Sequence, residues 1–209
     1  FRIPNTFRRL FSEGTFNAAF VPSYASELSQ GKEKSDEFAN KVFNLLILGL
    51  FFIVVIIEIF MPIFVFLIAP GFNGDSQKMD IVINLTRITF PFLFFISLAS
   101  FFSAILNSHN KFAAASAAPI ILNILLIGVL FSAKILNDKL VYYLSYAVTA
   151  SGIIQLIFLY LFVKNFYLPK FSFKIKIDEK IRKFFKKLLP SIFSSGVTQI
   201  NILVGTIIA

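Results

Sequence analysis

Apolar runs long enough to cross a lipid bilayer alternate with polar connections along the whole chain. A helix of about 20 apolar residues spans the hydrocarbon core, and open strands cannot replace it because their backbone groups would lack partners there. The pattern therefore predicts an all-α, polytopic transmembrane helix bundle. Six membrane helices are expected, at about Phe1–Ser26, Val42–Ala69, Ile81–Leu106, Phe112–Ala133, Leu140–Val163 and Leu188–Ala209. Prolines 62, 91, 119 and 190 fall in or beside these runs and permit kinks.

Two connections are longer than the others and rich in charge. The first, Ser26–Lys41, is interpreted as a loop of balanced charge. The second, Lys164–Lys187, holds nine Lys or Arg against two acidic residues. Within and just after it, apolar residues recur at helical spacing: Ile177, Ile181, Phe184, Phe185 and Leu188. This predicts a basic amphipathic helix lying on the membrane surface, as an ordinary anchor. Binding of anionic lipid headgroups by residues 164–187 is the alternative.

The distribution of basic residues sets the orientation of the bundle. With Lys164–Lys187 in the cytoplasm, Ser26–Lys41 and Asn107–Lys111 lie there too, and the three connections carry 13 Lys or Arg. The opposite connections, Gly71–Asp80 and Lys134–Lys139, carry only three. Cytoplasmic loops are enriched in Lys and Arg, so this arrangement is expected. We attribute the excess of Lys and Arg to contacts with the membrane, and we expect no nucleic-acid partner.

The first apolar segment carries an unusual number of polar side chains. On a helical wheel at about 100° per residue they fall within one arc of roughly 160°. These residues are Arg2, Asn5, Thr6, Arg8, Arg9, Ser12 and Glu13. Phe16 and Phe20 break the pattern because they fall on the same arc. Charge at membrane depth is expensive, on the order of 3 kcal/mol per residue on insertion scales, so such an arc is expected to face a cavity or a partner.

Four blocks in order along the chain resemble the MurJ/MviN-type lipid II flippases. These belong to the superfamily of multidrug, oligosaccharide-lipid and polysaccharide exporters. The first block, RIPNTFRRLFSEGTFNAAFVPSY, is similar to the second membrane helix of that family. The others are APGF at Ala69–Phe72, the run Arg87–Phe112 with AAPIILNI at Ala117–Ile124, and Leu189–Ala209, similar to the seventh helix. One short match would be weak, whereas four in order are specific.

The resemblance implies an organisation and a function. Residues 1–209 would be a partial transporter domain, the N-terminal lobe without its first helix, and the C-terminal lobe would be absent. The chain opens on Phe1 inside a motif and stops at Ala209 inside an apolar run, which also indicates a fragment. The expected function is translocation of lipid II, the undecaprenyl-diphosphate-linked peptidoglycan precursor, across the bacterial inner membrane. Alternating access would be the mechanism, as in rigid-body transporters.

Candidate substrate-binding residues follow from the polar arc together with the resemblance. Arginine binds phosphate oxygens in bidentate fashion, which suits a diphosphate headgroup. By resemblance, Arg8 takes the place of an arginine that lines the family's cationic cavity. Asn5 could donate to a headgroup oxygen, and Glu13 is expected to tune the arginine field. Arg9 either contacts substrate or pairs with Glu13 at i,i+4, with the ion pair favoured.

Several other polar residues receive a structural interpretation. Glu58 is expected to be interfacial or neutralised near the outer end of its helix, and Arg87 to reach the interface. The single His109 lies in a short polar connection and is expected at the surface, not as a ligand. Some relatives hold sodium partly through an acidic residue on the seventh helix, but no Asp or Glu follows Glu179 here. We therefore assign no metal and no cofactor.

Composition narrows the alternatives. The chain is 57% hydrophobic with 29 Phe, too apolar for a soluble protein, and it has no Cys for disulfides or thiolate chemistry. Another exporter of the superfamily, for polysaccharide lipids or drugs, is the nearest alternative, although a cation exporter should favour acidic cavity groups. A membrane enzyme acting on polyprenyl phosphates would need carboxylate or His clusters, often with a metal. No such cluster is visible, so we expect a transporter and not an enzyme.

Overall fold

The computed structural model describes residues 15–68, 76–133, 139–173 and 177–190. Within these ranges the chain forms helices and no strand. The labelled helices are α2 (Thr15–Leu28), α3 (Lys32–Ile59), α4 (Met61–Ile68), α5 (Ser76–Thr89), α6 (Phe92–Ser108), α7 (Phe112–Ala117), α8 (Ile120–Phe131) and α10 (Leu140–Val163). A further helix covers residues 179–190. The predicted all-α fold class is confirmed.

Within the described residues, four helical stretches are long and apolar enough to cross a membrane. They are Lys32–Ile59, Ser76–Ser108, Phe112–Phe131 and Leu140–Val163. These correspond to the second to fifth predicted spans, which are confirmed. The first predicted span is described only from residue 15, as α2, and the last only to residue 190. The rest of both spans lies outside the described residues.

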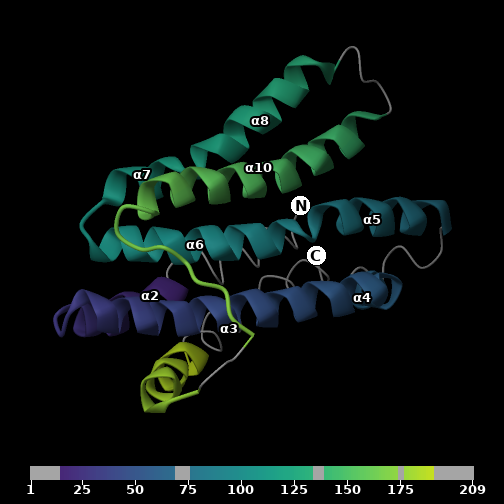
Figure 1. Ribbon diagram of the computed structural model, residues 1–209. Helices are drawn as coiled ribbons and strands as arrows, with labels where there is room; N and C mark the ends of the chain where they lie inside the picture. Colours follow the sequence, from purple (N-terminus) through teal and green to yellow (C-terminus); the bar gives the residue numbers. More distant parts are fainter. Residues whose placement is uncertain (1–14, 69–75, 134–138, 174–176, 191–209) are drawn as a thin grey trace.

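Proline interrupts two of the membrane stretches without ending them. Between α5 and α6, Pro91 follows Phe90, whose N–H still donates to the Thr86 carbonyl at 2.7 Å. Proline lacks an N–H and bends the helix where it occurs, so α5 and α6 form one kinked element (Figure 1). Pro119 separates α7 from α8 in the same way.

α6 is the central helix of the described bundle. α8 and α10 lie on one side of it and α3 on the other, with α5 continuing α6 toward the opposite end (Figure 1). Close packing of α6 and α10 depends on small side chains. At Gly152 of α10, an added Cβ would meet the ring of Phe92 at 2.8 Å and Cβ of Phe95 at 3.1 Å. Small residues let membrane helices approach in this way.

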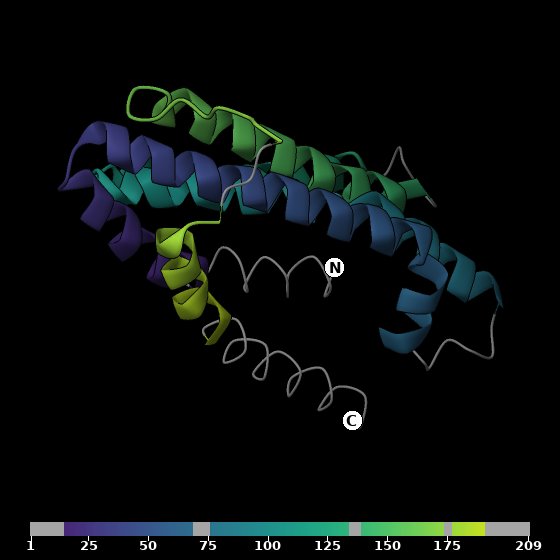
Figure 2. The same cartoon turned by 60° about the horizontal axis from the view of Figure 1, so that its bottom comes forward.

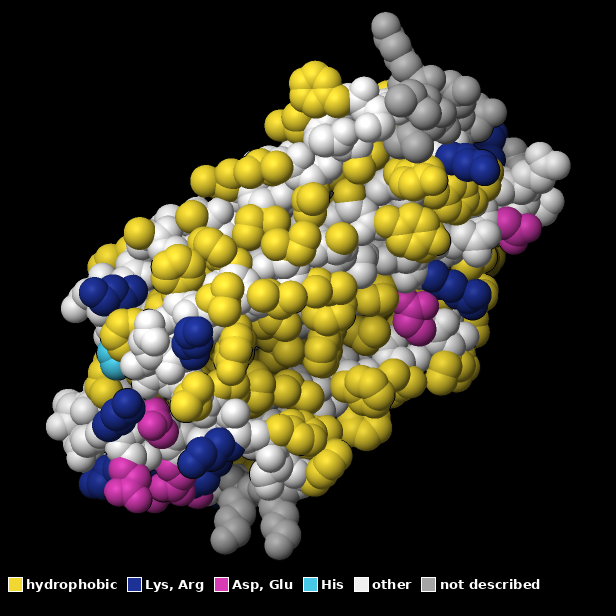
Figure 3. Space-filling model, turned by 45° about the horizontal axis from the view of Figure 1, so that its top comes forward, with side chains coloured by type: hydrophobic (Ala, Val, Ile, Leu, Met, Phe, Trp, Pro, Cys, Tyr) yellow, Lys and Arg dark blue, Asp and Glu magenta, His cyan; other side chains and the backbone are white. Residues whose placement is uncertain are grey.

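The core is strongly aromatic and gathers where α2, α3, α6 and helix 179–190 meet. Its fully buried rings include Phe20, Phe101 and Tyr167. Seen from another side, α2 and helix 179–190 lie on the same face of α3 (Figure 2). The outer surface is apolar as well, and Figure 3 shows a broad hydrophobic band with Lys, Arg, Asp and Glu gathered toward the two ends. This is the surface expected of a bundle embedded in lipid.

The predicted loop at Ser26–Lys41 is wrong for most of its length. α2 continues to Leu28, α3 begins at Lys32, and only a tight turn joins them. Gly31 occupies that turn with φ +125°, a conformation that L side chains rarely adopt. The charges misled the interpretation because four of them, Lys32, Glu33, Lys34 and Glu37, lie on the exposed side of α3. Its buried residues recur at helical spacing: Ser35, Phe38, Ala39 and Val42.

Candidate functional site

The four residues predicted to bind substrate, Asn5, Arg8, Arg9 and Glu13, lie outside the described residues. Their placement therefore stays a prediction. What the structure does describe is α2, which follows them directly in the sequence, and the elements that hold α2 in place.

α2 is anchored by a stripe of aromatic side chains one turn apart. Phe16, Phe20 and Tyr24 are 3%, 0% and 1% exposed, and their rings stack at centroid distances of 5.2 and 5.5 Å. Phe20 also meets Phe101 of α6 edge to face at 5.2 Å. Phe16 and Phe20 are the two residues that broke the polar arc. They do so because, in this half of the segment, that side of α2 packs against protein and not against a wet cavity.

The end of α2 is tied to two other connections through His109. Its Nε2 lies 3.2 Å from the Tyr24 hydroxyl oxygen, and its ring stacks on Phe166 at 4.7 Å. Burial lowers the pKa of His109, Lys32 lowers it further, and Asp36 partly opposes them. The expected surface position of His109 is therefore corrected: the ring is half-buried, and its packing favours the neutral form. Sequence reasoning missed this because the aromatic partners come from distant segments.

The chain that follows α10 is fastened along α3 as an extended strap, residues 164–173. Asn40 accepts hydrogen bonds from the Tyr167 hydroxyl at 2.7 Å and from the Lys170 N–H at 2.8 Å. One turn further, Asn44 donates to the Lys170 carbonyl at 3.2 Å and accepts from the Ser172 N–H at 2.9 Å. Burial raises the pKa of Tyr167, so its hydroxyl stays protonated. The sequence did contain a signal for this contact, the two asparagines Asn40 and Asn44 at i,i+4 beside an apolar run.

Two ion pairs hold the start of helix 179–190. Lys41 of α3 contacts Asp178 at 2.6 Å and Glu37 at 2.6 Å, and Lys180 contacts Glu27 of α2 at 2.6 Å. Asp178 also accepts a hydrogen bond from the Ile181 N–H at 2.9 Å, which caps the helix. Partial burial raises the pKa of Asp178, but the Lys41 ammonium and the Ile181 N–H outweigh it and the net shift is downward.

Helix 179–190 is amphipathic as predicted, but its apolar side is not free for the membrane. Ile181, Phe184 and Leu188 are 0%, 3% and 6% exposed and belong to the protein core. Phe184 meets the rings of Phe16 and Phe38 edge to face, both at 6.0 Å. The prediction of an apolar side resting on the bilayer is therefore corrected. A hydrophobic stripe alone does not distinguish a lipid surface from a neighbouring helix.

The three basic connections meet at one end of the bundle. His109 joins two of them to the end of α2 through Phe166 and Tyr24, and the ion pairs of Lys41 and Lys180 link the first connection to the third. This is the arrangement that the charge distribution predicted. At the opposite end Arg87 is exposed, and its charge acts on Glu58, whose buried Oε1 has no hydrogen-bond partner among the residues that the structure describes. Among the described residues no group of His, Asp and Glu could hold a metal ion.

Comparison with known proteins identifies the family of this chain. The model of the family described as "Lipid II flippase MurJ" matches residues 1–209. The chain belongs to this family. The MurJ relative of Rhizobium tropici is 39% identical over 220 residues, and that of Rickettsia prowazekii is 35% identical over 209 residues. Both carry the name "Probable lipid II flippase MurJ".

A solved MurJ structure has the same fold. It is titled "Lipid II flippase MurJ, inward closed conformation" and superposes with a TM-score of 0.78 at 27% identity, covering 97% of this chain and 41% of the other. The chain spans about 40% of the length of the curated MurJ relatives it matches, and all of the chain is covered by that from R. tropici. With family membership and four membrane-length helices in its described part, it is a multi-pass inner-membrane protein.

Proposed function

We propose that the protein carrying this chain is a lipid II flippase. It would move the undecaprenyl-diphosphate-linked peptidoglycan precursor from the cytoplasmic to the outer leaflet of the inner membrane. The observation that carries the proposal is the match of the MurJ family model along the whole of residues 1–209. The likeness to a solved MurJ structure at a TM-score of 0.78 supports it. The proposed activity is transport, with no covalent step.

The proposed substrate contacts are those of the polar arc. Arg8 holds the diphosphate by a bidentate pair of hydrogen bonds, which a guanidinium makes and an ammonium does not. Asn5 donates to a headgroup oxygen, while Arg9 and Glu13 set the local field. The site is displayed to either side of the membrane in turn by alternating access. The aromatic stripe of α2, from Phe16 to Tyr24, supports this role. It holds α2 in place, and α2 directly follows the residues of the polar arc in the sequence.

We also propose that residues 1–209 supply the second to seventh helices of the N-terminal lobe, and that the other helices belong to the remainder of the protein. The basic stretch 164–187 lies in the cytoplasmic headgroup layer and contacts anionic lipids there. Nine Lys or Arg in that stretch, each worth about 1 kcal/mol near an anionic surface, support the assignment.

Substitution of Arg8 in the full-length protein tests the proposal. Arg8→Ala should abolish rescue of a strain depleted of its lipid II flippase, and lipid II should stay inaccessible from the outer leaflet. Arg8→Lys should rescue only in part, because the charge remains without the planar fork. Arg87→Ala is the matched control, since that arginine is exposed at the far end of the bundle. Normal growth and lipid II exposure with Arg8→Ala would exclude the proposed role of Arg8. Unchanged lipid II exposure after depletion of the protein itself would exclude the function.

A further inference from the structure

The strap carries two phenylalanine rings that lie on the surface of the described structure. Phe171 and Phe173 are 50% and 77% exposed, and their rings meet edge to face at a centroid distance of 4.8 Å. The backbone between them is held on α3, because the Ser172 N–H donates to Asn44 at 2.9 Å. An exposed apolar patch rimmed by polar residues marks an interaction site. The two rings therefore form a fixed apolar surface on a connection between helices.

The direction of the rings follows from the other side of the strap. The strap runs from the end of α10 toward the middle of α3 (Figure 1). Lys170 lines a polar cleft together with Lys32, in the first turn of α3. Successive side chains of an extended segment point to opposite sides. Phe171 and Phe173 thus point away from that cleft and toward the apolar part of α3, where residues 42–57 include no charged side chain.

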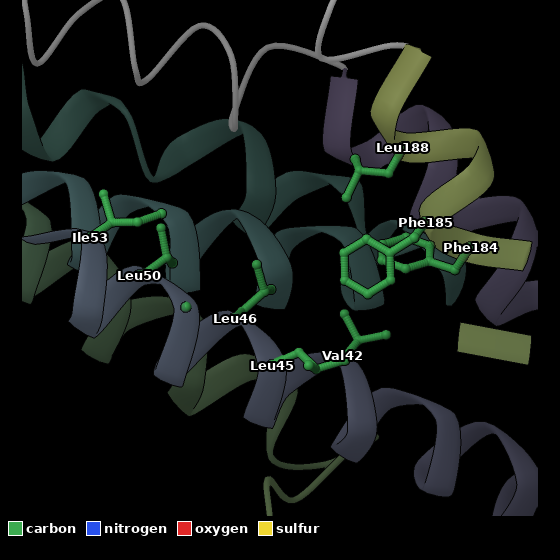
Figure 4. Close-up of a pocket in the computed structure, with 9 residues that line it drawn as sticks. Val42, Leu45, Leu46, Leu50, Ile53, Phe184, Phe185 and Leu188 are labelled. Carbon is green, nitrogen blue, oxygen red and sulfur yellow. The ribbon is translucent and has the colours of Figure 1, made fainter. Parts of the chain in front are cut away.

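The strap lies on the side of α3 away from the protein core. On a helix of 100° per residue, Asn40 and Asn44 each lie roughly 160° around α3 from Val42. The Val42 side is covered by helix 179–190, whose Phe184 and Leu188 point toward it (Figure 4). α2 lies on that same face of α3 (Figure 2). Both ends of the described chain, α2 and helix 179–190, therefore pack on one side of α3 and the strap on the other.

The chemistry around the rings fits an anionic lipid surface. Residues 164–177 include four Lys and no Asp or Glu. Lys164 and Lys170 are exposed beside the rings. Basic side chains attract anionic headgroups, and aromatic rings enter the boundary between headgroups and acyl chains. The strap also follows directly on α10, whose last turn exposes Leu161 and Phe162 at the lipid-facing surface.

We propose that Phe171 and Phe173 insert into the cytoplasmic leaflet, at the boundary between headgroups and acyl chains, with Lys164 and Lys170 on the headgroup side. The strap, and not the apolar side of helix 179–190, is then the membrane anchor of this basic stretch. Because the strap is bonded to α3, the anchor sets the depth of that helix in the leaflet. This rests on the proposed cytoplasmic position of residues 164–187, and not on the identity of the transported substrate.

Spin-label accessibility in the full-length protein tests the insertion. Nitroxides are attached at Phe171→Cys or Phe173→Cys, in a background without other cysteines, in vesicles of phosphatidylglycerol and phosphatidylcholine. Lipid dissolves oxygen and excludes a charged or polar Ni(II) chelate. We expect both labels to collide more with oxygen than with the chelate, at a depth of about 5–10 Å. Ser172→Cys is the matched control, because it lies between them on the other side of the strap and should give a lower ratio.

Two reference positions calibrate the measurement. Ile124→Cys gives the lipid value, because Ile124 is 62% exposed on the membrane helix α8. Lys34→Cys gives the water value, because Lys34 is exposed in the first turn of α3. Greater accessibility to the chelate than to oxygen at both rings would place them in water and overturn the proposal. Low accessibility to both reagents would place the rings against protein and overturn it too.

A second measurement needs no cysteine variant at the rings. Phe173 is replaced by a diazirine-bearing phenylalanine analogue, and photolysis should add the mass of one phospholipid to the peptide that contains it. A crosslink to another protein segment would contradict the insertion. Reaction of Lys34→Cys with an impermeant maleimide in spheroplasts would overturn the orientation, and the cytoplasmic leaflet with it. Arg8→Ala should leave depth and crosslink unchanged, so this proposal and the proposed function fail separately.

Discussion

Phe184 provides the sharpest test of how helix 179–190 is held. Its ring is 3% exposed and lies within 6.2 Å, centroid to centroid, of Phe16, Phe20 and Phe38. Truncating a buried Phe to Ala costs about 3–5 kcal/mol through lost burial and the cavity left behind. The ion pairs at the start of the helix remain in the variant, so we take the lower end, about 3 kcal/mol, as the loss in docking free energy.

Hydrogen–deuterium exchange of the peptide covering residues 179–190 measures this loss. A decrease of about 3 kcal/mol in the free energy of local opening raises the exchange rate roughly 100-fold when closing is fast. Phe173→Ala is the matched control, because Phe173 is 77% exposed and its truncation should change exchange little. Equal exchange in the Phe184→Ala and wild-type proteins would refute the reasoning and return the helix to the lipid surface.

Three further predictions concern the packing and the strap. Gly152→Ala should lower the thermal midpoint in detergent by crowding Phe92, at a cost of about 1–3 kcal/mol, while Gly128→Ala should not. Asn44→Leu should free the strap because it removes two hydrogen bonds, about 1 kcal/mol each. Trypsin cleavage after Lys170 should then increase, and unchanged cleavage would contradict the role of Asn44 in holding the strap. Because the pKa of His109 is lowered from its ordinary 6.5, its contribution to stability is fully present above pH 6.5 and is lost as the pH falls through 6.5 toward the folded value. Thermal midpoints at pH 7.5 and 5 should show this loss, and His109→Phe should lack it.

The membrane helices were predictable from sequence because length and apolarity decide them locally. The spans ending at Val163 and Phe131 appear in the structure with nearly the predicted bounds. The same reasoning failed at Ser26–Lys41, where abundant charge was taken as evidence of a loop. A helix that extends beyond the bilayer places its charges on the side that faces water. The buried positions Phe38 and Ala39 were the signal that distinguished such a helix from a loop.

The contacts around the site could not be predicted because they join distant segments. Nothing local indicates that Tyr24 meets His109, 85 residues later, or that Asn40 meets Tyr167, 127 residues later. Helical spacing did identify the apolar residues of helix 179–190, but not what covers them. Periodicity reports which side of a helix is apolar, and only the packed chain shows whether lipid or protein lies against it.

The strap between α10 and helix 179–190 has a mechanical consequence. It is bonded to α3 at Asn40 and Asn44, and the ion pair of Lys41 with Asp178 ties the residue just before helix 179–190 to the same helix. Residues 167–172 are therefore bonded to α3 at successive points and follow it as one body. When α3 tilts, residues 167–172 must tilt with it, and the ion pair of Lys41 with Asp178 draws the start of helix 179–190 in the same direction.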